Sequence, residues 1–212
     1  ETLAVVLKLR NRASLALWAG DNENDLASRW SLGNLARDPN SYRITREVIP
    51  NVLKEYDVTR PYLPSSPYVT KEAFAKKADP AEDHMWGGPR AWWKTDYYTK
   101  TPCWFCSEGG AHAIPARSSL ERMMGRAAAE RPWENPDVKD WKDLKWTDEW
   151  AYRATNPYLD KKSYLMHRND IALRQCAALF GDVPRHDLDL FIAQSQSAQA
   201  ESIKFQVENF RS

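Results

Sequence analysis

The stretch Ser14-Leu15-Ala16-Leu17-Trp18-Ala19-Gly20-Asp21-Asn22-Glu23 decides the fold class. Its apolar run over 14–18 is closed by Gly20, a pattern typical of a short strand that is buried on both faces. Polar side chains follow at once. A second apolar run, over 101–107, is followed directly by Glu108. The sequence therefore predicts two buried strands, each followed by a carboxylate.

Segments with helical periodicity alternate with these runs. We expect helices over 3–9, 44–56, 118–124, 163–180 and 187–210. In the third, Ser118 and Glu121 fit a capping box; in the last, Ile203, Val207 and Phe210 share one face. Strands that alternate with helices imply a parallel sheet covered by helices, an α/β fold, over all 212 residues. The Trp-rich stretch 131–158 has no clean period and is predicted to be a long loop or insertion.

The two carboxylates suggest a chemistry. Polar groups at the C-terminal ends of parallel strands are where α/β barrels place their active sites, so Glu23 and Glu108 can share one mouth. Hydrolysis of a glycosidic bond by a retaining mechanism requires two carboxyl groups about 5–5.5 Å apart. Asn22 then lies beside the acid, where its amide can bind a sugar hydroxyl. The alternative interpretation is that each Glu is a solvated residue or a helix cap.

Composition narrows the function classes. The 30 Lys and Arg residues balance 29 Asp and Glu, which excludes the charge pattern of a general nucleic-acid binder. No uninterrupted apolar stretch is long enough to predict a membrane span, and the chain shows no signal-peptide pattern. The ten Trp and nine Tyr side chains suit an interface or a pocket for a ligand with polar groups and apolar faces, such as a sugar.

Several motifs resemble glycoside hydrolase family 2, in its β-mannosidase-like branch. In chain order they are Leu9-Arg10-Asn11-Arg12-Ala13-Ser14, Leu17-Trp18-Ala19-Gly20-Asp21-Asn22-Glu23, Arg60-Pro61-Tyr62-Leu63-Pro64-Ser65-Ser66-Pro67, His84-Met85-Trp86, Phe105-Cys106-Ser107-Glu108-Gly109 and Ser195-Gln196-Ser197-Ala198-Gln199-Ala200-Glu201. The first departs from the family at Arg12 and Ala13, where the family has His and Pro. The matches run in order across nearly the whole chain.

The resemblance implies a (β/α)8 TIM-barrel catalytic domain, of which this chain covers about strand 4 to helix 7. It implies that Glu23 is the general acid/base and Glu108 the nucleophile, and that Trp86 lines the sugar site. We expect Asn22, Trp18, Trp30 and His84 to bind substrate as well. A surface or core role is an equal alternative for His84.

The implied function is a retaining exo-β-glycosidase that acts on a carbohydrate, with β-mannosides favoured. Glucosaminides, galactosides and glucuronides are alternatives, as is a non-catalytic carbohydrate-binding fragment. The resemblance also implies that the other barrel half or accessory β-sandwich domains act as partners, in cis or as another chain, and it favours a secreted or periplasmic location.

No metal and no cofactor are predicted. The pair Cys103 and Cys106 has metal-ligand spacing but lacks the further ligands that a structural zinc site needs. No Gly-rich phosphate loop precedes a helix, which argues against nucleotide binding.

Overall fold

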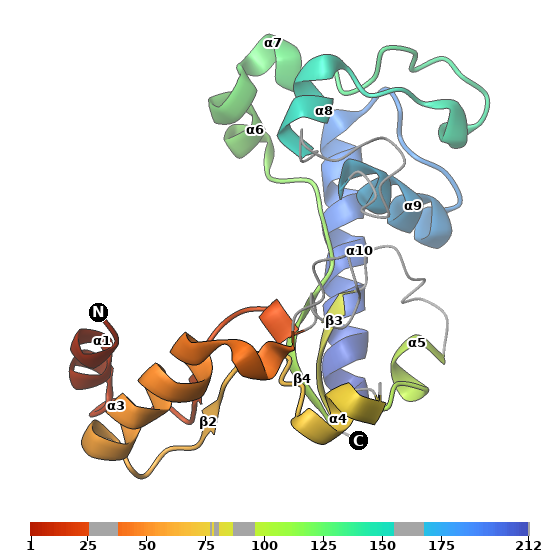
Figure 1. Cartoon of the computed structure of the whole chain (residues 1–212). Helices are drawn as coiled ribbons and strands as arrows, with labels where there is room; N and C mark the ends of the chain where they lie inside the picture. The colour runs from red at the N-terminus through yellow and green to blue at the C-terminus, as the bar shows by residue number, and fades with distance from the viewer. Residues whose placement is uncertain (26–37, 77, 79–80, 87–95, 155–167, 212) are drawn as a thin grey trace. The chain divides into compact units, whose positions relative to one another are not determined.

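The computed structural model describes residues 1–25, 38–76, 78, 81–86, 96–154 and 168–211 (Figure 1). The chain divides into two compact units. Unit 1 comprises Glu1–Met85 and Thr101–Glu108, and unit 2 comprises Trp86–Lys100 and Gly109–Ser212.

Two helical segments of unit 1 pack on each other. α1 (Thr2–Leu9) and α3 (Ile49–Tyr56) contact one another and bury Val6 and Leu53. The π-helix η2 (Ile44–Val48) runs directly into α3, so the helix predicted over 44–56 is confirmed as one helical segment of two geometries. Pro50 has no N–H to donate to the preceding turn, which accounts for the wider turn before it. The short 3-10 helix η1 (Pro39–Ser41) precedes this segment.

β1 (Trp18–Ala19) pairs in parallel with β2 (Tyr62–Leu63), and an isolated bridge joins Asn22 to Ser66 further along. The strand predicted over 14–18 was therefore wrong in its bounds. The main-chain N–H of Trp18 donates to the Pro61 carbonyl, but Pro61 has no N–H to donate in return. Pairing consequently cannot extend toward residue 14.

β3 (Glu82–Trp86) pairs with β4 (Phe105–Gly110), and α4 (Lys71–Lys76) precedes β3 (Figure 1). The strand expected over 101–107 begins at Phe105 and continues through Glu108, so this carboxylate lies within the strand and not after it. Pairing begins where the Trp104 and Phe105 amides both donate to the Ala81 carbonyl.

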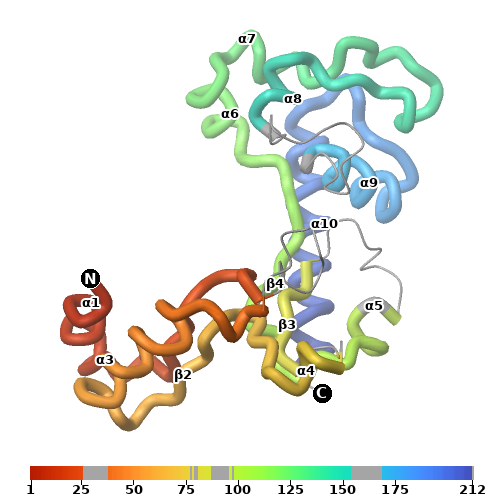
Figure 2. The backbone as a smooth tube through the Cα atoms, viewed as in Figure 1, coloured from red at the N-terminus to blue at the C-terminus, as the bar shows by residue number. Residues whose placement is uncertain are grey.

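Unit 2 is helical in most of its described residues. Its helices are α5 (Asp96–Thr99), α6 (Arg117–Met124), α7 (Arg126–Ala129), η3 (Trp141–Asp143), α8 (Asp148–Ala154), α9 (Arg168–Phe180) and α10 (Leu188–Asn209), which Figure 2 traces along the backbone. The helices expected over 118–124 and 187–210 are confirmed, and the one expected over 163–180 is confirmed from residue 168. Residues 163–167 lie outside the described residues.

The core of unit 2 is aromatic. Trp133, Trp150 and Phe191 are buried together, and Trp146 packs between them with its ring centroid 4.1 Å from that of Trp133. An antiparallel bridge joins Trp133 to Trp146. The tryptophans of the stretch predicted as an insertion therefore pack it onto α9 and α10.

One detail of the helices differs from expectation, and the burial along α10 was not predicted. α6 is capped at Ala116 with no side-chain hydrogen bond, so Ser118 lies inside the helix and the capping box is wrong. In α10, Ile203 and Val207 are exposed, while Ser195 and Ala198 are buried.

From Ser195 onward the buried positions of α10 are mostly small or polar, and side chains in this part of the helix bond the backbone that follows β4. Ser195 Oγ accepts the Ile114 N–H at 3.0 Å, and Gln196 and Gln199 donate to the carbonyls of Ile114 and Ala111. An extended buried segment needs such partners for its peptide groups. Among the described helices, none is both long enough and apolar enough to cross a bilayer.

We predict that Phe191→Ala lowers the free energy of unfolding by about 3–5 kcal/mol, because it leaves a cavity among the core tryptophans. The matched control is Leu190→Ala, one residue earlier on α10, whose side chain is exposed; it should change stability by no more than about 0.5 kcal/mol. Urea unfolding followed by tryptophan fluorescence measures both. Equal losses would contradict this assignment of the core.

Candidate active site

The loop after β1 carries Glu23 in a strained backbone conformation. Its N–H donates to the Ser66 carbonyl at 2.8 Å, and the Ser66 N–H donates to the Asp21 carbonyl at 3.0 Å. Glu23 has φ +61°, and it is the one non-glycine residue with positive φ in the described part of the chain. A glutamate adopts this region only where its surroundings impose it, and such residues cluster at functional sites.

Trp18 anchors the start of this loop. Its indole N–H donates to Asp57 at 2.9 Å, and the Arg60 guanidinium pairs with the same carboxylate. Chiefly because of the Trp18 hydrogen bond, the pKa of Asp57 lies below its ordinary value. The indole N–H of Trp18 thus serves the scaffold, and its predicted contact with a sugar ring stays a prediction.

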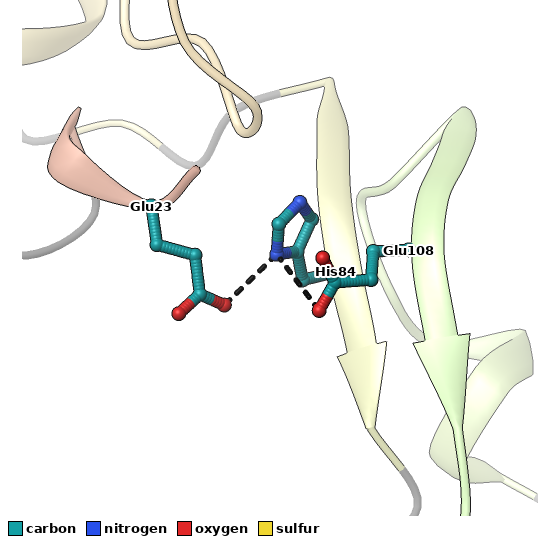
Figure 3. Close-up of side chains that lie close together, drawn as sticks. All are labelled: Glu23, His84 and Glu108. Carbon is teal, nitrogen blue, oxygen red and sulfur yellow. Dashed lines mark hydrogen bonds and ion pairs between the residues drawn. The ribbon is translucent and has the colours of Figure 1, made fainter. Parts of the chain in front are cut away.

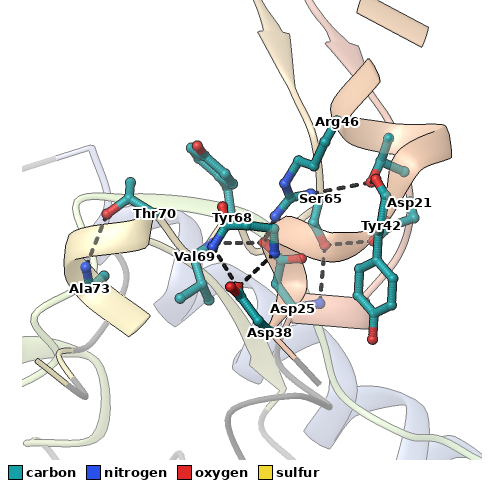
Figure 4. Close-up of polar contacts among 12 residues, drawn as sticks. Asp21, Asp25, Asp38, Tyr42, Arg46, Ser65, Tyr68, Val69, Thr70 and Ala73 are labelled. Carbon is teal, nitrogen blue, oxygen red and sulfur yellow. Dashed lines mark hydrogen bonds and ion pairs between the residues drawn. The ribbon is translucent and has the colours of Figure 1, made fainter. Parts of the chain in front are cut away.

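Buried Asp25 anchors the far side of the loop (Figure 4). It accepts hydrogen bonds from Arg46 at 2.7 Å and from the Val69 N–H at 3.0 Å, while Ser65 Oγ donates to Asp21 at 2.6 Å. Burial raises the pKa of Asp25 despite its partners. The segment 21–25 is thereby fixed to the Ser-Ser-Pro turn at both ends.

His84 brings the two predicted catalytic carboxylates together (Figure 3). Its Nδ1 lies 2.8 Å from Oε1 of Glu23 and 3.6 Å from Oε1 of Glu108. One nitrogen of His84 and one carboxylate oxygen from each Glu all lie within 4.8 Å of one another. The imidazole is 2% exposed, whereas the Glu23 and Glu108 side chains are 41% and 38% exposed. Solvent therefore reaches the carboxylates while the ring behind them is covered.

A second set of groups holds the other side of the imidazole. Ser66 Oγ lies 3.0 Å from Nε2 of His84 and 2.6 Å from Oε1 of Glu82, and Ser107 Oγ also donates to Glu82. Ser66, Glu82 and Ser107 were not predicted from the sequence as part of the site. A signal did exist for Glu82: it lies two residues before His84 on one strand, and alternate residues of a strand share a face.

The remaining predicted binding residues are more scattered. Asn22 is exposed beside Glu23. Trp30 lies outside the described residues. Trp86 belongs to unit 2, where its ring stacks on His112 with centroids 5.5 Å apart. Their roles as sugar ligands stay predictions.

Two glycines near the site pack against the protein itself. A Cβ on Gly20 would fall on the Pro64 carbonyl oxygen, and one on Gly109 would fall on the Gln206 side chain. Close packing of backbone against backbone requires glycine at Gly20.

The three groups Glu23, His84 and Glu108 also have the composition of a metal site. Ligands about 2.0–2.1 Å from a tetrahedral ion lie roughly 3.4 Å from each other. The separation of 2.8 Å between His84 and Glu23 is shorter than that and is an ordinary hydrogen-bond length. The geometry of this pair therefore favours a shared proton.

Cys103 and Cys106 form no disulfide. Burial raises the pKa of Cys103 to about 11, which disfavours the thiolate that a metal would bind. The Cys106 thiol contacts the Glu108 carbonyl at 3.3 Å.

The chain is similar to a solved structure, the β-D-mannosidase from Dictyoglomus thermophilum. The TM-score is 0.70 and the sequence identity 23%, and the match covers 99% of this chain and 23% of that chain. The fold is thus related to part of a β-mannosidase. No family model and no curated protein sequence matches. The described residues form two two-stranded sheets, so the eight-stranded barrel stays a prediction.

We predict that Gly20→Ala destabilises unit 1 by about 1–3 kcal/mol, since overpacking forces β1 away from β2. Ala19→Ser, at an exposed neighbouring position, is the control. Thermal unfolding of the two variants checks this, and an unaffected Gly20→Ala protein would show that the two strands are not in close contact.

A second prediction concerns metal. Calorimetric titration with Zn²⁺ after treatment with a chelator should give the same result for the natural protein and for His84→Gln. Binding that is tight in the natural protein and lost in His84→Gln would contradict the hydrogen-bonded interpretation of this site.

Proposed function

We propose that the protein is a retaining β-glycosidase that removes terminal β-linked sugars, with β-mannosides as the favoured substrates. One observation carries the proposal: Glu23 and Glu108, remote in sequence, present carboxylate oxygens within 4.8 Å of each other at a solvent-accessible position. A double displacement requires carboxyl groups about 5–5.5 Å apart, whereas inversion requires about 6.5–9.5 Å.

In the first step of this mechanism, a carboxylate oxygen of Glu108 attacks the anomeric carbon. The bond from that carbon to the leaving oxygen breaks, and Glu23 gives its proton to the leaving oxygen. The product is a glycosyl ester on Glu108 together with the free alcohol.

In the second step, Glu23 acts as a base. It takes a proton from water while the water oxygen attacks the anomeric carbon and releases Glu108 as a carboxylate. The two displacements restore the original configuration of the sugar. Glu23 is protonated again and Glu108 ionised again, as at the start.

The proposal extends to the surroundings of the site. We infer that both strand pairs belong to a (β/α)8 barrel whose other strands come from a longer chain or from another chain. The similarity to 23% of a much longer β-mannosidase chain supports this. The preference for mannose over glucosamine, galactose or glucuronic acid depends on pocket residues that the other strands would contribute.

We predict that Glu23→Gln and Glu108→Gln each lower turnover of a 4-nitrophenyl β-mannoside by about 10²–10⁴-fold, the contribution typical of acid–base groups. The assay uses the full-length natural protein, and a panel of nitrophenyl glycosides identifies the sugar. Glu47→Gln is the control, because this exposed Glu of unit 1 pairs only with Arg43 in the described contacts. Near-normal hydrolysis by either site variant would refute the assignment of roles.

Azide separates the two roles. With Glu108→Ala, azide should restore activity and give the α-glycosyl azide, since it replaces the nucleophile in a single displacement. With Glu23→Ala it should give the β-glycosyl azide, since it replaces water in the second step. Exchanged stereochemistry would mean that the assignments of Glu23 and Glu108 must be reversed.

A further inference from the structure

His84 faces two carboxylates at Nδ1 and a serine hydroxyl at Nε2, and these partners decide where its protons lie. Glu23 and Glu108 face Nδ1, and Glu82 faces Nε2 through Ser66. The backbone N–H of His84 donates to Asp83. The charged groups that the described contacts place around this imidazole are thus all carboxylates.

The contacts of Glu82 decide which group donates a proton at Nε2 of His84. Glu82 accepts the Tyr68 N–H at 2.7 Å and the hydroxyls of Ser66 and Ser107, so all its described contacts are donors to an ionised carboxylate. A hydroxyl has one proton, and the shorter, charge-assisted contact takes it. Ser66 is 2.6 Å from Glu82 and 3.0 Å from His84. Ser66 therefore donates to Glu82 and accepts a proton from Nε2.

The proton on Nε2 determines what Nδ1 can present to Glu23. A neutral imidazole that carries its proton on Nε2 presents a lone pair at Nδ1. The Glu23 oxygen 2.8 Å away cannot approach a lone pair at hydrogen-bond distance unless a proton lies between the two atoms. Glu108, at 3.6 Å, lies beyond hydrogen-bond distance. One proton is therefore shared by Glu23 and His84.

We propose that Glu82, acting through Ser66, is a positioning residue that fixes a proton of His84 on Nε2 and so holds Nδ1, with the proton that it shares, against Glu23. The inference rests on the proposed function for its catalytic meaning. It distinguishes the two carboxylates, because Glu23 lies within hydrogen-bond distance of Nδ1 and Glu108 does not.

Loss of Ser66 removes the acceptor from Nε2. The imidazole then has no partner that holds Nδ1 against Glu23, so the shared proton is delivered less effectively to the leaving oxygen. The loss of rate is therefore largest for substrates whose leaving oxygen needs a proton.

The test compares leaving groups, because protonation matters only where the leaving oxygen is basic. Ser66→Ala in the full-length protein should lose about tenfold or more in kcat/KM on a phenyl or methyl β-mannoside. On the 2,4-dinitrophenyl mannoside, which needs no acid, its loss should be below about threefold. The control is Ser65→Ala, in the same turn, which bonds Asp21 and not His84; its loss should not depend on the leaving group.

Equal losses of Ser66→Ala on all substrates would overturn the relay while leaving the proposed function intact. If the protein hydrolyses no glycoside at all, nitrogen NMR of histidine-labelled protein tests the relay separately. The chain has four His residues, and the spectrum of His84→Gln assigns the relevant signal. We expect a bound proton on Nε2 in the natural protein. A bare Nε2 would overturn the relay without any variant.

Discussion

Ser66 is the residue on which the site depends, because its main chain and its side chain hold different parts of it. Its carbonyl accepts the Glu23 N–H, and its N–H donates to Asp21, which continues the pairing of β1 with β2. Its hydroxyl lies between His84 and Glu82. One residue thereby couples the backbone of the proposed acid to the proton on the imidazole behind it.

The arrangement concentrates negative charge in a way that a purely structural cluster would avoid. Glu23, Glu108 and Glu82 surround one nearly buried imidazole, and Glu23 has a backbone conformation that disfavours glutamate. Such local conflicts are expected where a protein places its chemistry, and the rest of the fold must compensate for them. The hydrogen bonds of Asp25 and the ion pair of Asp57 provide that compensation on either side of the loop.

The sequence allowed prediction of the groups that meet at the candidate site but not of the residues that support them. Glu23, Glu108 and His84 lie in motifs whose residue types point to chemistry, and the structure brings these three together. Ser66 and Glu82 were not predicted, because a serine or a glutamate in a loop or strand acquires its partners only from tertiary contacts. The bounds predicted for the strand over 14–18 were wrong because Pro61, on the partner strand, has no N–H and ends the pairing. The contacts of Ser195 and Gln196 on α10 were not predicted either, because these side chains bond backbone groups of another segment.

In the proposed mechanism, Glu108 bonds covalently to the sugar while Glu23 remains the proton carrier. Incubation of the full-length protein with 2,4-dinitrophenyl 2-deoxy-2-fluoro-β-mannoside should trap the glycosyl ester, since the fluorine slows its hydrolysis. Mass spectrometry of the digested protein should then find one fluoromannosyl group, on the peptide that contains Glu108. A label on any other residue would contradict the account, and so would release of an α-configured sugar as the first product from an unlabelled enzyme.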